Sequence, residues 1–361
     1  MHYTGQVYRP PLEAYTPLLE VTYGCSHNKC AFCTMYGMTN FGISLIKDVE
    51  SDILEISMTY PRPIERIYLL NGDPFVLSTE KLVEIADLIH KYIPEVKTIT
   101  SYASFYNLKN KTKEDLKLLR EKGYNELWFG VETGNQKVLD WLDKGADLDD
   151  YKKGIEKMKY ANMTYNAIVM QGVAGNGNSK ENARETAKFL NLYPPIGIFI
   201  MSTDVQRGSK LYKMREEGDF KETTNRENLE EQIELLKNLD VPGNVLYSSD
   251  HIVNLVKVTS HMRNKEKMIK KLEDALENLD EKILDSKNKG RAIWKIGCCK
   301  IFLQQPIFYL LLSTASLYFF IVFLWKNKVM NAKGSVIKYL INSENISIAK
   351  NNSKEDPMSL L

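Results

Sequence analysis

The sequence predicts an α/β protein: a partial (β/α)6-type TIM-like barrel of parallel strands, followed by a C-terminal hydrophobic helix. Over residues 1–285, short apolar runs of β type alternate with segments of helical period. Alternation of this kind means parallel pairing with right-handed crossover connections. A run of 25 residues without charge then begins at Ile301. We therefore divide the chain into an N-terminal segment 1–15, a barrel core with its extension 16–285, a basic linker 286–300, the hydrophobic helix 301–325 and a polar tail 326–361.

The strands are predicted where apolar runs are rich in β-branched or aromatic residues. In chain order these runs are Pro17–Tyr23, Arg66–Leu70, Val96–Ser101, Glu126–Val131, Thr164–Gln171, Gly197–Ser202 and Val245–Ser248.

Helical segments separate these runs, and two of them have readable ends. Ser78 is expected to cap a helix over Thr79–Tyr92, whose apolar residues share one face: Leu82, Ile85, Ala86 and Ile89. A capping-box pattern at Thr112 opens the predicted helix Lys113–Lys122. Gly123 follows it, at the position where a left-handed residue commonly ends a helix.

The composition is that of a globular protein, and its charge is unevenly distributed. The 361 residues are 43% hydrophobic and 26% charged, which excludes a wholly disordered, collagen-like or disulfide-stapled chain. Residues 286–361 carry 11 Lys and Arg against 3 Asp and Glu, a net charge of +8, whereas the whole chain has +2. Residues 1–285 are therefore acidic, at −6. Because an acidic body is not the footprint of a nucleic-acid-binding domain, a nucleic acid partner is not expected.

The hydrophobic run Ile301–Trp325 is long enough to cross a bilayer, which takes about 20 apolar residues. It lacks the polar face of a globular helix, although a buried core helix is the alternative. Between 281 and 300 there are 6 Lys and Arg, and between 326 and 345 there are 4. The positive-inside tendency therefore predicts a cytoplasmic catalytic domain, anchored by a single C-terminal transmembrane helix.

The most informative segment is the cysteine loop, Gly24–Cys33, directly after the first predicted strand. The chain has 5 cysteines, and Cys25, Cys30 and Cys33 lie within nine residues. The number of cysteines is odd, three of them are clustered, and no signal peptide is visible. These features favour metal binding in a reducing compartment over disulfides. Zinc would need a fourth ligand, for which His27 is the candidate. An iron–sulfur cluster normally uses four cysteines, so three would leave one iron open to another ligand.

The spacing Cys-x4-Cys-x2-Cys resembles a variant of the radical S-adenosylmethionine (SAM) signature, whose usual form is Cys-x3-Cys-x2-Cys. Further motifs in the expected order extend the resemblance over about residues 16–285. They are Asn71-Gly72-Asp73-Pro74, Gly130-Val131-Glu132-Thr133-Gly134, a glycine-rich turn from Gly172 through Gly175 and Gly177, and Arg207-Gly208-Ser209-Lys210-Leu211-Tyr212. The pattern is similar to the radical SAM core of the elongator-subunit and methylthiotransferase type.

The resemblance implies a radical SAM enzyme with a 4Fe–4S cluster and SAM as cofactors. The cluster ligands would be Cys25, Cys30 and Cys33. Residues that would bind SAM are Phe32, Asn71, Gly72, Asp73, Glu132 and Gly172. The enzyme would cleave SAM reductively to a 5′-deoxyadenosyl radical, which abstracts a hydrogen atom from a substrate. A flavodoxin- or ferredoxin-like protein would donate the electron.

Several of these residues have simpler interpretations. One simpler interpretation is that Asp73 and Pro74 serve just to shape a turn. Another is that Glu132 is the surface acid of a helix start. The glycines from Gly172 to Gly177 match no complete phosphate-cradling pattern and fit a bare loop equally well, and Phe32 fits simple packing. Arg207 and His251 fit a pocket or the surface equally well, and Asp250 fits a turn better than an acid catalyst.

The sequence does not indicate the substrate. There is no second cysteine group for an auxiliary cluster, which disfavours methylthiotransferases and peptide-maturing members. The alternatives to a radical SAM enzyme are a Cys3His zinc-binding interaction module and a non-catalytic, membrane-anchored scaffold.

Overall fold

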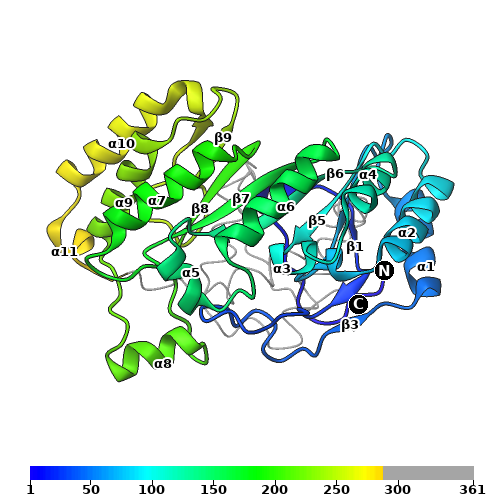
Figure 1. Ribbon diagram of the computed structural model, residues 1–361, viewed down its shortest axis with the longest axis horizontal. Helices are drawn as coiled ribbons and strands as arrows, with labels where there is room; N and C mark the ends of the chain where they lie inside the picture. Colours follow the sequence, from blue (N-terminus) through cyan, green and yellow to red (C-terminus); the bar gives the residue numbers. More distant parts are fainter. Residues whose placement is uncertain (288–361) are drawn as a thin grey trace, which may run out of the picture. The chain divides into compact units, whose positions relative to one another are not determined.

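A computed structural model describes residues 1–287, and the core of this part is one eight-stranded sheet (Figure 1). Its strands follow the spatial order β1-β4-β5-β6-β7-β8-β9-β10. The neighbours from β1 to β9 pair in parallel, and β10 pairs antiparallel to β9. The strands are β1 Leu18–Leu19, β4 Arg66–Leu69, β5 Thr98–Ala103, β6 Tyr124–Glu132, β7 Thr164–Gln171, β8 Gly197–Ser202, β9 Leu246–Ser248 and β10 Thr259–His261.

All seven predicted strands are confirmed, as is the partial TIM-like barrel of parallel strands. Seven parallel strands are present in residues 1–287, as many as the predicted runs and one more than the six of a (β/α)6 barrel. The strands β1 and β10 are the two ends of the sheet order, so the barrel is open rather than closed.

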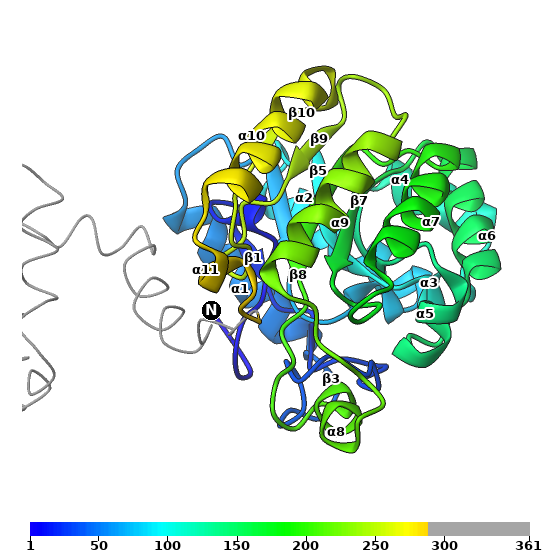
Figure 2. The same ribbon diagram turned by 90° about the vertical axis from the view of Figure 1, so that its left-hand side faces the viewer.

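Helices cover the outer side of the sheet (Figures 1 and 2). The predicted helix Thr79–Tyr92 has those bounds, with the Ser78 side chain as its cap, and Lys113–Glu121 opens with the predicted capping box. Gly123 has the left-handed φ of 99°. The α-helices are α1 Ile46–Thr59, α2 Thr79–Tyr92, α3 Phe105–Leu108, α4 Lys113–Glu121, α5 Gln136–Leu142, α6 Leu148–Tyr160, α7 Ser179–Leu192, α8 Lys210–Glu217, α9 Asn225–Asn238, α10 Lys265–Asn278 and α11 Glu281–Leu284.

The strands bury both of their faces. Along β4, Ile67 and Leu69 pack into the large core between sheet and helices. Tyr68 and the following Leu70 belong to a smaller inner cluster, which also contains Trp128 and Phe199. The alternation follows from the two-residue period of a strand. Side chains therefore fill the inside of the barrel.

The first predicted strand is divided in two at Glu20 and Val21, with the bend at Val21. After β1, the chain leaves β4 and pairs as β2, Thr22–Tyr23, antiparallel to β3, Gly42–Ile43. Glu20 is buried directly before the bend, where its carboxylate accepts hydrogen bonds from the Thr4 amide and the Asn71 side chain. The cysteine loop lies in the connection between β2 and β3.

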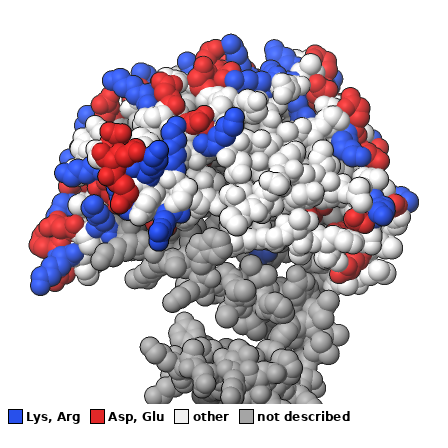
Figure 3. All heavy atoms as spheres, turned by 90° about the horizontal axis from the view of Figure 1, so that it is seen from below, with Lys and Arg blue, Asp and Glu red and all other residues white. Residues whose placement is uncertain are grey.

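Because the strands are parallel, the loops after them gather at one end of the barrel, where enzymes of this architecture place their sites. Figure 3 views the molecule from the side on which α8 and β3 lie in Figure 1. Among the coloured and white residues of Figure 3, most charged side chains lie toward the rim of that face.

The predicted hydrophobic helix 301–325, the polar tail 326–361 and nearly all of the basic linker 286–300 lie outside the described residues. Within residues 1–287, every helix is too short or too polar to cross a membrane.

Candidate metal and cofactor site

The cysteine loop is held between two helices by its backbone. Ala31 is fully buried, its amide donates to the Leu142 carbonyl at the end of α5 (2.9 Å), and its carbonyl accepts from the Leu211 amide in α8 (2.7 Å). The amide of Cys33 donates to the carbonyl of Cys30 (3.1 Å), which turns the chain between these two cysteines. The motif around Ser209 and Leu211 therefore supports the cysteine loop, a role that the sequence did not indicate.

All three cysteines of the loop are free and half-buried. Burial raises the pKa of Cys25 and Cys30, and raises that of Cys33 to about 11. Negative charge on Cys30 and Cys25 adds to this increase at Cys33, which indicates that the three thiols share one region. Thiols with such pKa values bind metal only by releasing their protons to it.

The arrangement does not supply a Cys3His zinc site. The Nε2 atom of His27 lies 2.6 Å from the carbonyl oxygen of Asp143, and the ring packs on Tyr106 with centroids 5.6 Å apart. Among residues 1–287, no three His, Cys, Asp or Glu side chains converge closely enough for one metal ion. A cluster of several irons binds each thiolate to a different iron, so its ligands need not converge in this way.

Gly72 lies directly against the cysteine loop. Its amide donates to the Gly24 carbonyl (3.2 Å), and a β-carbon at Gly72 would lie 2.7 Å from the β-carbon of Cys25. Asn71 precedes it with a left-handed φ of 77°, and its side chain donates to the Thr22 carbonyl (3.0 Å). The Oδ1 atom of Asn71 is buried without a partner. The predicted motif after β4 therefore meets one of the predicted metal ligands, Cys25.

Asp73 is a buried carboxylate with one oxygen in use. Its Oδ2 atom accepts hydrogen bonds from the Ser104 hydroxyl and from Asn107 Nδ2 (2.5 Å). Its Oδ1 atom has no partner. Burial raises the pKa of Asp73 to about 6, against the hydrogen bonds of Ser104 and Asn107, which lower it. Such a group can accept a hydrogen bond from a cationic ligand, and it does more than shape the turn at Pro74.

Glu132 ends β6 with a left-handed φ of 61° and is 6% exposed. Its Oε1 atom lies 2.8 Å from Lys144 Nζ, which is itself 5.7 Å from the ring centroid of Phe32. Burial alone would lower the pKa of Lys144, but the Glu132 carboxylate, together with Tyr151 and Cys30 nearby, raises it. Glu132 is therefore not the exposed acid of a helix start. Lys144 was missed because no motif marks it.

The glycine-rich turn after β7 has its own carboxylate partners. Gly172 has a φ of 77°, and its amide donates to Glu231 Oε2 (2.6 Å); the amide of Gly177 donates to Glu227 Oε1 (2.6 Å). Because these two amides are occupied, they cannot cradle a phosphate. Both glutamates lie on α9 and were also missed by sequence reasoning.

The remaining candidates lie at the surface or in turns. Arg207 is exposed. Asp250 is exposed and pairs with Lys257 (2.9 Å), as expected of a turn residue. His251 Nδ1 accepts from the Val253 amide (3.4 Å) within the same turn, and burial lowers its pKa.

Known proteins resemble this chain over parts of their length. An uncharacterized protein of Methanocaldococcus jannaschii is 26% identical over 216 residues, which are 56% of this chain and 65% of that protein. The heme chaperone HemW of Bacillus subtilis is 31% identical over 104 residues, 29% of this chain and 27% of its own. The chain thus spans less than two thirds of these curated relatives. Among solved structures, methylornithine synthase (PylB) has a TM-score of 0.46 at 16% identity, covering 63% of this chain and 64% of that one.

The family profile described as the radical SAM superfamily matches residues 19–190, from the first strand to the end of α7. That range includes the cysteine loop, the Asn71–Pro74 motif and the Gly130–Gly134 motif, all at one end of the barrel. Residues 19–190 of this chain are therefore a radical SAM domain, and members of that superfamily use a 4Fe–4S cluster and SAM.

Proposed function

We propose that this chain uses the reductive cleavage of SAM to remove a hydrogen atom from a substrate, with Cys25, Cys30 and Cys33 as the cluster ligands. The observation that carries the proposal is the contact of Gly72 with Cys25 beside Asp73, whose buried Oδ1 atom has no partner. When bound together, the cluster and SAM supply a 5′-deoxyadenosyl radical.

The residues at the site fit the charges of SAM. A buried carboxylate without a partner for one oxygen is costly, and a ligand cation offsets that cost. Asp73 Oδ1 and the amide oxygen Asn71 Oδ1 are both buried acceptors without a partner, and they flank Gly72, which approaches Cys25. They suit the amino group of the methionine part. Superfamily members more often have glutamate at the position of Asp73, so the shorter side chain relies on Ser104 and Asn107 to orient it.

Two other groups complete the proposed site. Glu132, with Lys144 and Phe32 beside it, is proposed to contact the ribose or the methionine part. Gly172 is proposed to let the turn after β7 pass close to the adenosine. The next residue of that turn, Val173, belongs to the small apolar cluster against which Phe32 of the cysteine loop packs. The mainly apolar filling of the barrel would exclude water from the reaction.

The test is anaerobic reconstitution with iron and sulfide. Wild type should be brown, hold about four irons per chain, and release 5′-deoxyadenosine from SAM with dithionite. Cys30→Ala should lose the iron, and Cys298→Ala should keep it as the matched control. A colourless protein with one zinc, or equal loss in both variants, would refute the proposed ligand set.

A one-electron donor of the flavodoxin or ferredoxin type is the proposed partner, because the reaction consumes an electron. Membrane anchoring through residues 301–325 remains a proposal from the sequence, with the catalytic part in the cytoplasm. Fractionation of the full-length chain tests it: recovery in the soluble fraction without detergent would contradict the anchor.

A further inference from the structure

The helix α9 presents two carboxylates, Glu227 and Glu231, to the turn that follows β7. They are four residues apart and so lie on one face of the helix. Glu231 is 3% exposed. Neither belongs to the motifs that the superfamily resemblance marks, and neither touches a proposed cluster ligand.

Glu231 binds the start of the turn. Its Oε2 atom accepts from the Gly172 amide (2.6 Å), and its Oε1 atom accepts from Asn182 Nδ2 (2.8 Å). Asn182 Oδ1 in turn accepts from the hydroxyl of Thr133 (2.6 Å), the residue after Glu132. One hydrogen-bonded chain therefore links the turn after β7 to the end of β6.

Glu227 binds the end of the turn. Its Oε1 atom accepts from the Gly177 amide (2.6 Å) and from the Ser179 hydroxyl (2.9 Å), and its Oε2 atom accepts from Asn176 Nδ2 (2.6 Å). The turn contains three glycines with left-handed φ, at Gly172, Gly175 and Gly177. Such a segment has little conformational preference of its own, so its shape depends on these carboxylates.

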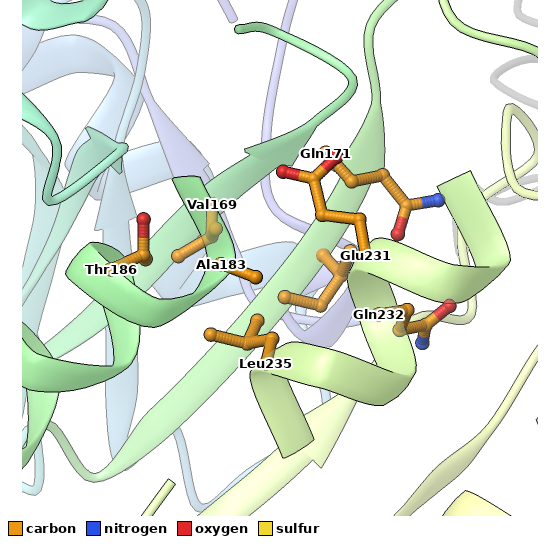
Figure 4. Close-up of a pocket in the computed structure, with 8 residues that line it drawn as sticks. Val169, Gln171, Ala183, Thr186, Glu231, Gln232 and Leu235 are labelled. Carbon is orange, nitrogen blue, oxygen red and sulfur yellow. The ribbon is translucent and has the colours of Figure 1, made fainter. Parts of the chain in front are cut away.

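Burying the carboxyl group of Glu231 costs more free energy than packing alone would require. It lines a small cavity between β7, β8, α7 and α9 together with Gln171, whose Oε1 atom has no partner (Figure 4). The cavity has about enough room for one water molecule, so it is no ligand site. Burial raises the pKa of Glu231 to about 7, against the hydrogen bonds of Asn182 and Gly172. An apolar residue there would avoid this cost.

We infer that Glu231 and Glu227 are positioning residues, which hold the turn from Gly172 to Gly177 in the shape that binds the adenosine part of SAM. This inference rests on the proposed function, since that function places SAM at the turn. The two glutamates act through the turn and do not themselves contact SAM.

The experiment compares reconstituted wild type with Glu231→Gln and Glu227→Gln. Each variant keeps its side-chain size but replaces one acceptor oxygen with a donor group. Glu234→Gln is the matched control, because Glu234 lies on the same helix and pairs with Arg184 (2.6 Å) away from the turn. Three quantities are measured: iron per chain, the Kd of SAM by equilibrium dialysis without reductant, and the rate of 5′-deoxyadenosine release at saturating SAM.

We expect Glu231→Gln and Glu227→Gln each to weaken SAM binding about tenfold, as the loss of a hydrogen bond to a charged group predicts. Iron content and the rate at saturating SAM should stay at the wild-type level, as should all three quantities for Glu234→Gln. A merely structural role would lower iron content and stability and leave the Kd of the folded fraction unchanged.

An unchanged Kd in both variants, with full iron content, would overturn the inference and leave the proposed function intact. If Glu231→Gln does not fold, Glu227→Gln decides, because Glu227 is less buried. If wild type neither binds nor cleaves SAM, the proposed function fails, and the inference fails with it.

Discussion

At the scale of single residues, the site depends on polar groups buried with part of their bonding capacity unused. Asp73 has one bonded and one free oxygen, and Asn71 has a free Oδ1 atom. Unpaired acceptors of this kind cost free energy in the absence of a ligand. We interpret them as prepared for a bound cation.

Asp73→Asn tests this interpretation. The variant removes the negative charge of residue 73. It replaces the carboxylate that accepts from Ser104 and Asn107 with a neutral amide. We expect SAM binding to weaken at least tenfold, with iron content unchanged, because the charged acceptor is lost. Equilibrium dialysis and iron analysis measure both effects. Asp87→Asn, in an exposed pair with Lys122, should behave as wild type.

The stability of the fold should depend on pH through Glu231. Its pKa is raised from an ordinary 4.5 to about 7, so between these values the folded chain binds more protons than the unfolded chain. The contribution of Glu231 to the free energy of unfolding is therefore highest below pH 4.5 and falls by about 3 kcal/mol as the pH rises to about 7.

Urea unfolding of the metal-free chain at several pH values measures this dependence, with Glu231→Gln as the comparison. Asp73, whose pKa is raised to about 6, adds a change of the same sign that both proteins share. The difference between the two proteins isolates Glu231. Equal pH dependence in wild type and Glu231→Gln would contradict the assignment.

At the scale of secondary-structure elements, the site is made by close approaches between loops that follow different strands. Gly72, after β4, approaches Cys25, after β2; Gly134, after β6, approaches α7, where a β-carbon would lie 2.6 Å from the Glu185 carbonyl oxygen. Each approach needs a residue without a side chain. The glycines of the superfamily motifs therefore set distances between elements.

Gly72→Ala should disrupt cluster assembly while the barrel still folds. The new β-carbon would lie 2.7 Å from the Cys25 β-carbon and 2.9 Å from the Gly24 carbonyl oxygen, so the cysteine loop must move. We expect iron content after reconstitution to fall to less than about half of wild type. Gly37→Ala is the control in the same hairpin, since its β-carbon makes an ordinary 3.5 Å contact. Full iron content in Gly72→Ala would contradict the argument.

At the scale of the whole molecule, the N-terminal segment is tied into the barrel rather than set apart from it. Glu13 is 1% exposed, and its carboxylate accepts from Arg66 Nη2 (2.6 Å) and from the indole of Trp128 (3.1 Å). Arg66 also pairs with Glu126 (2.9 Å). This partly buried network joins the segment before β1 to β4 and β6.

Arg66→Leu should destabilise the fold by about 3 kcal/mol, because it leaves the buried Glu13 carboxylate without a counter-charge. Adding Glu13→Gln should restore at least half of the loss, since a neutral amide needs no cation and still accepts from Trp128. Chemical denaturation measures the free energy of unfolding of the three proteins. A loss of less than about 1 kcal/mol in the single variant would show that the network is not a buried pair.

Local sequence signals were sufficient for part of the secondary structure. The helix Thr79–Tyr92 and the capping box at Thr112 were predicted because periodicity and capping depend on neighbours within a few residues. The bend after Glu20 was not predicted, since the partners that stabilise the buried Glu20 carboxylate are Thr4 and the distant Asn71.

The sequence by itself determined the fold class, the superfamily and the order of its motifs around the barrel. Only the tertiary structure decided which side chains meet. Lys144 joins Glu132 across 12 residues, Asn107 joins Asp73 across 34, and Glu231 joins Gly172 across 59. The physical reason is that a parallel sheet brings the carboxyl ends of its strands together at one edge, whatever the length of chain between them.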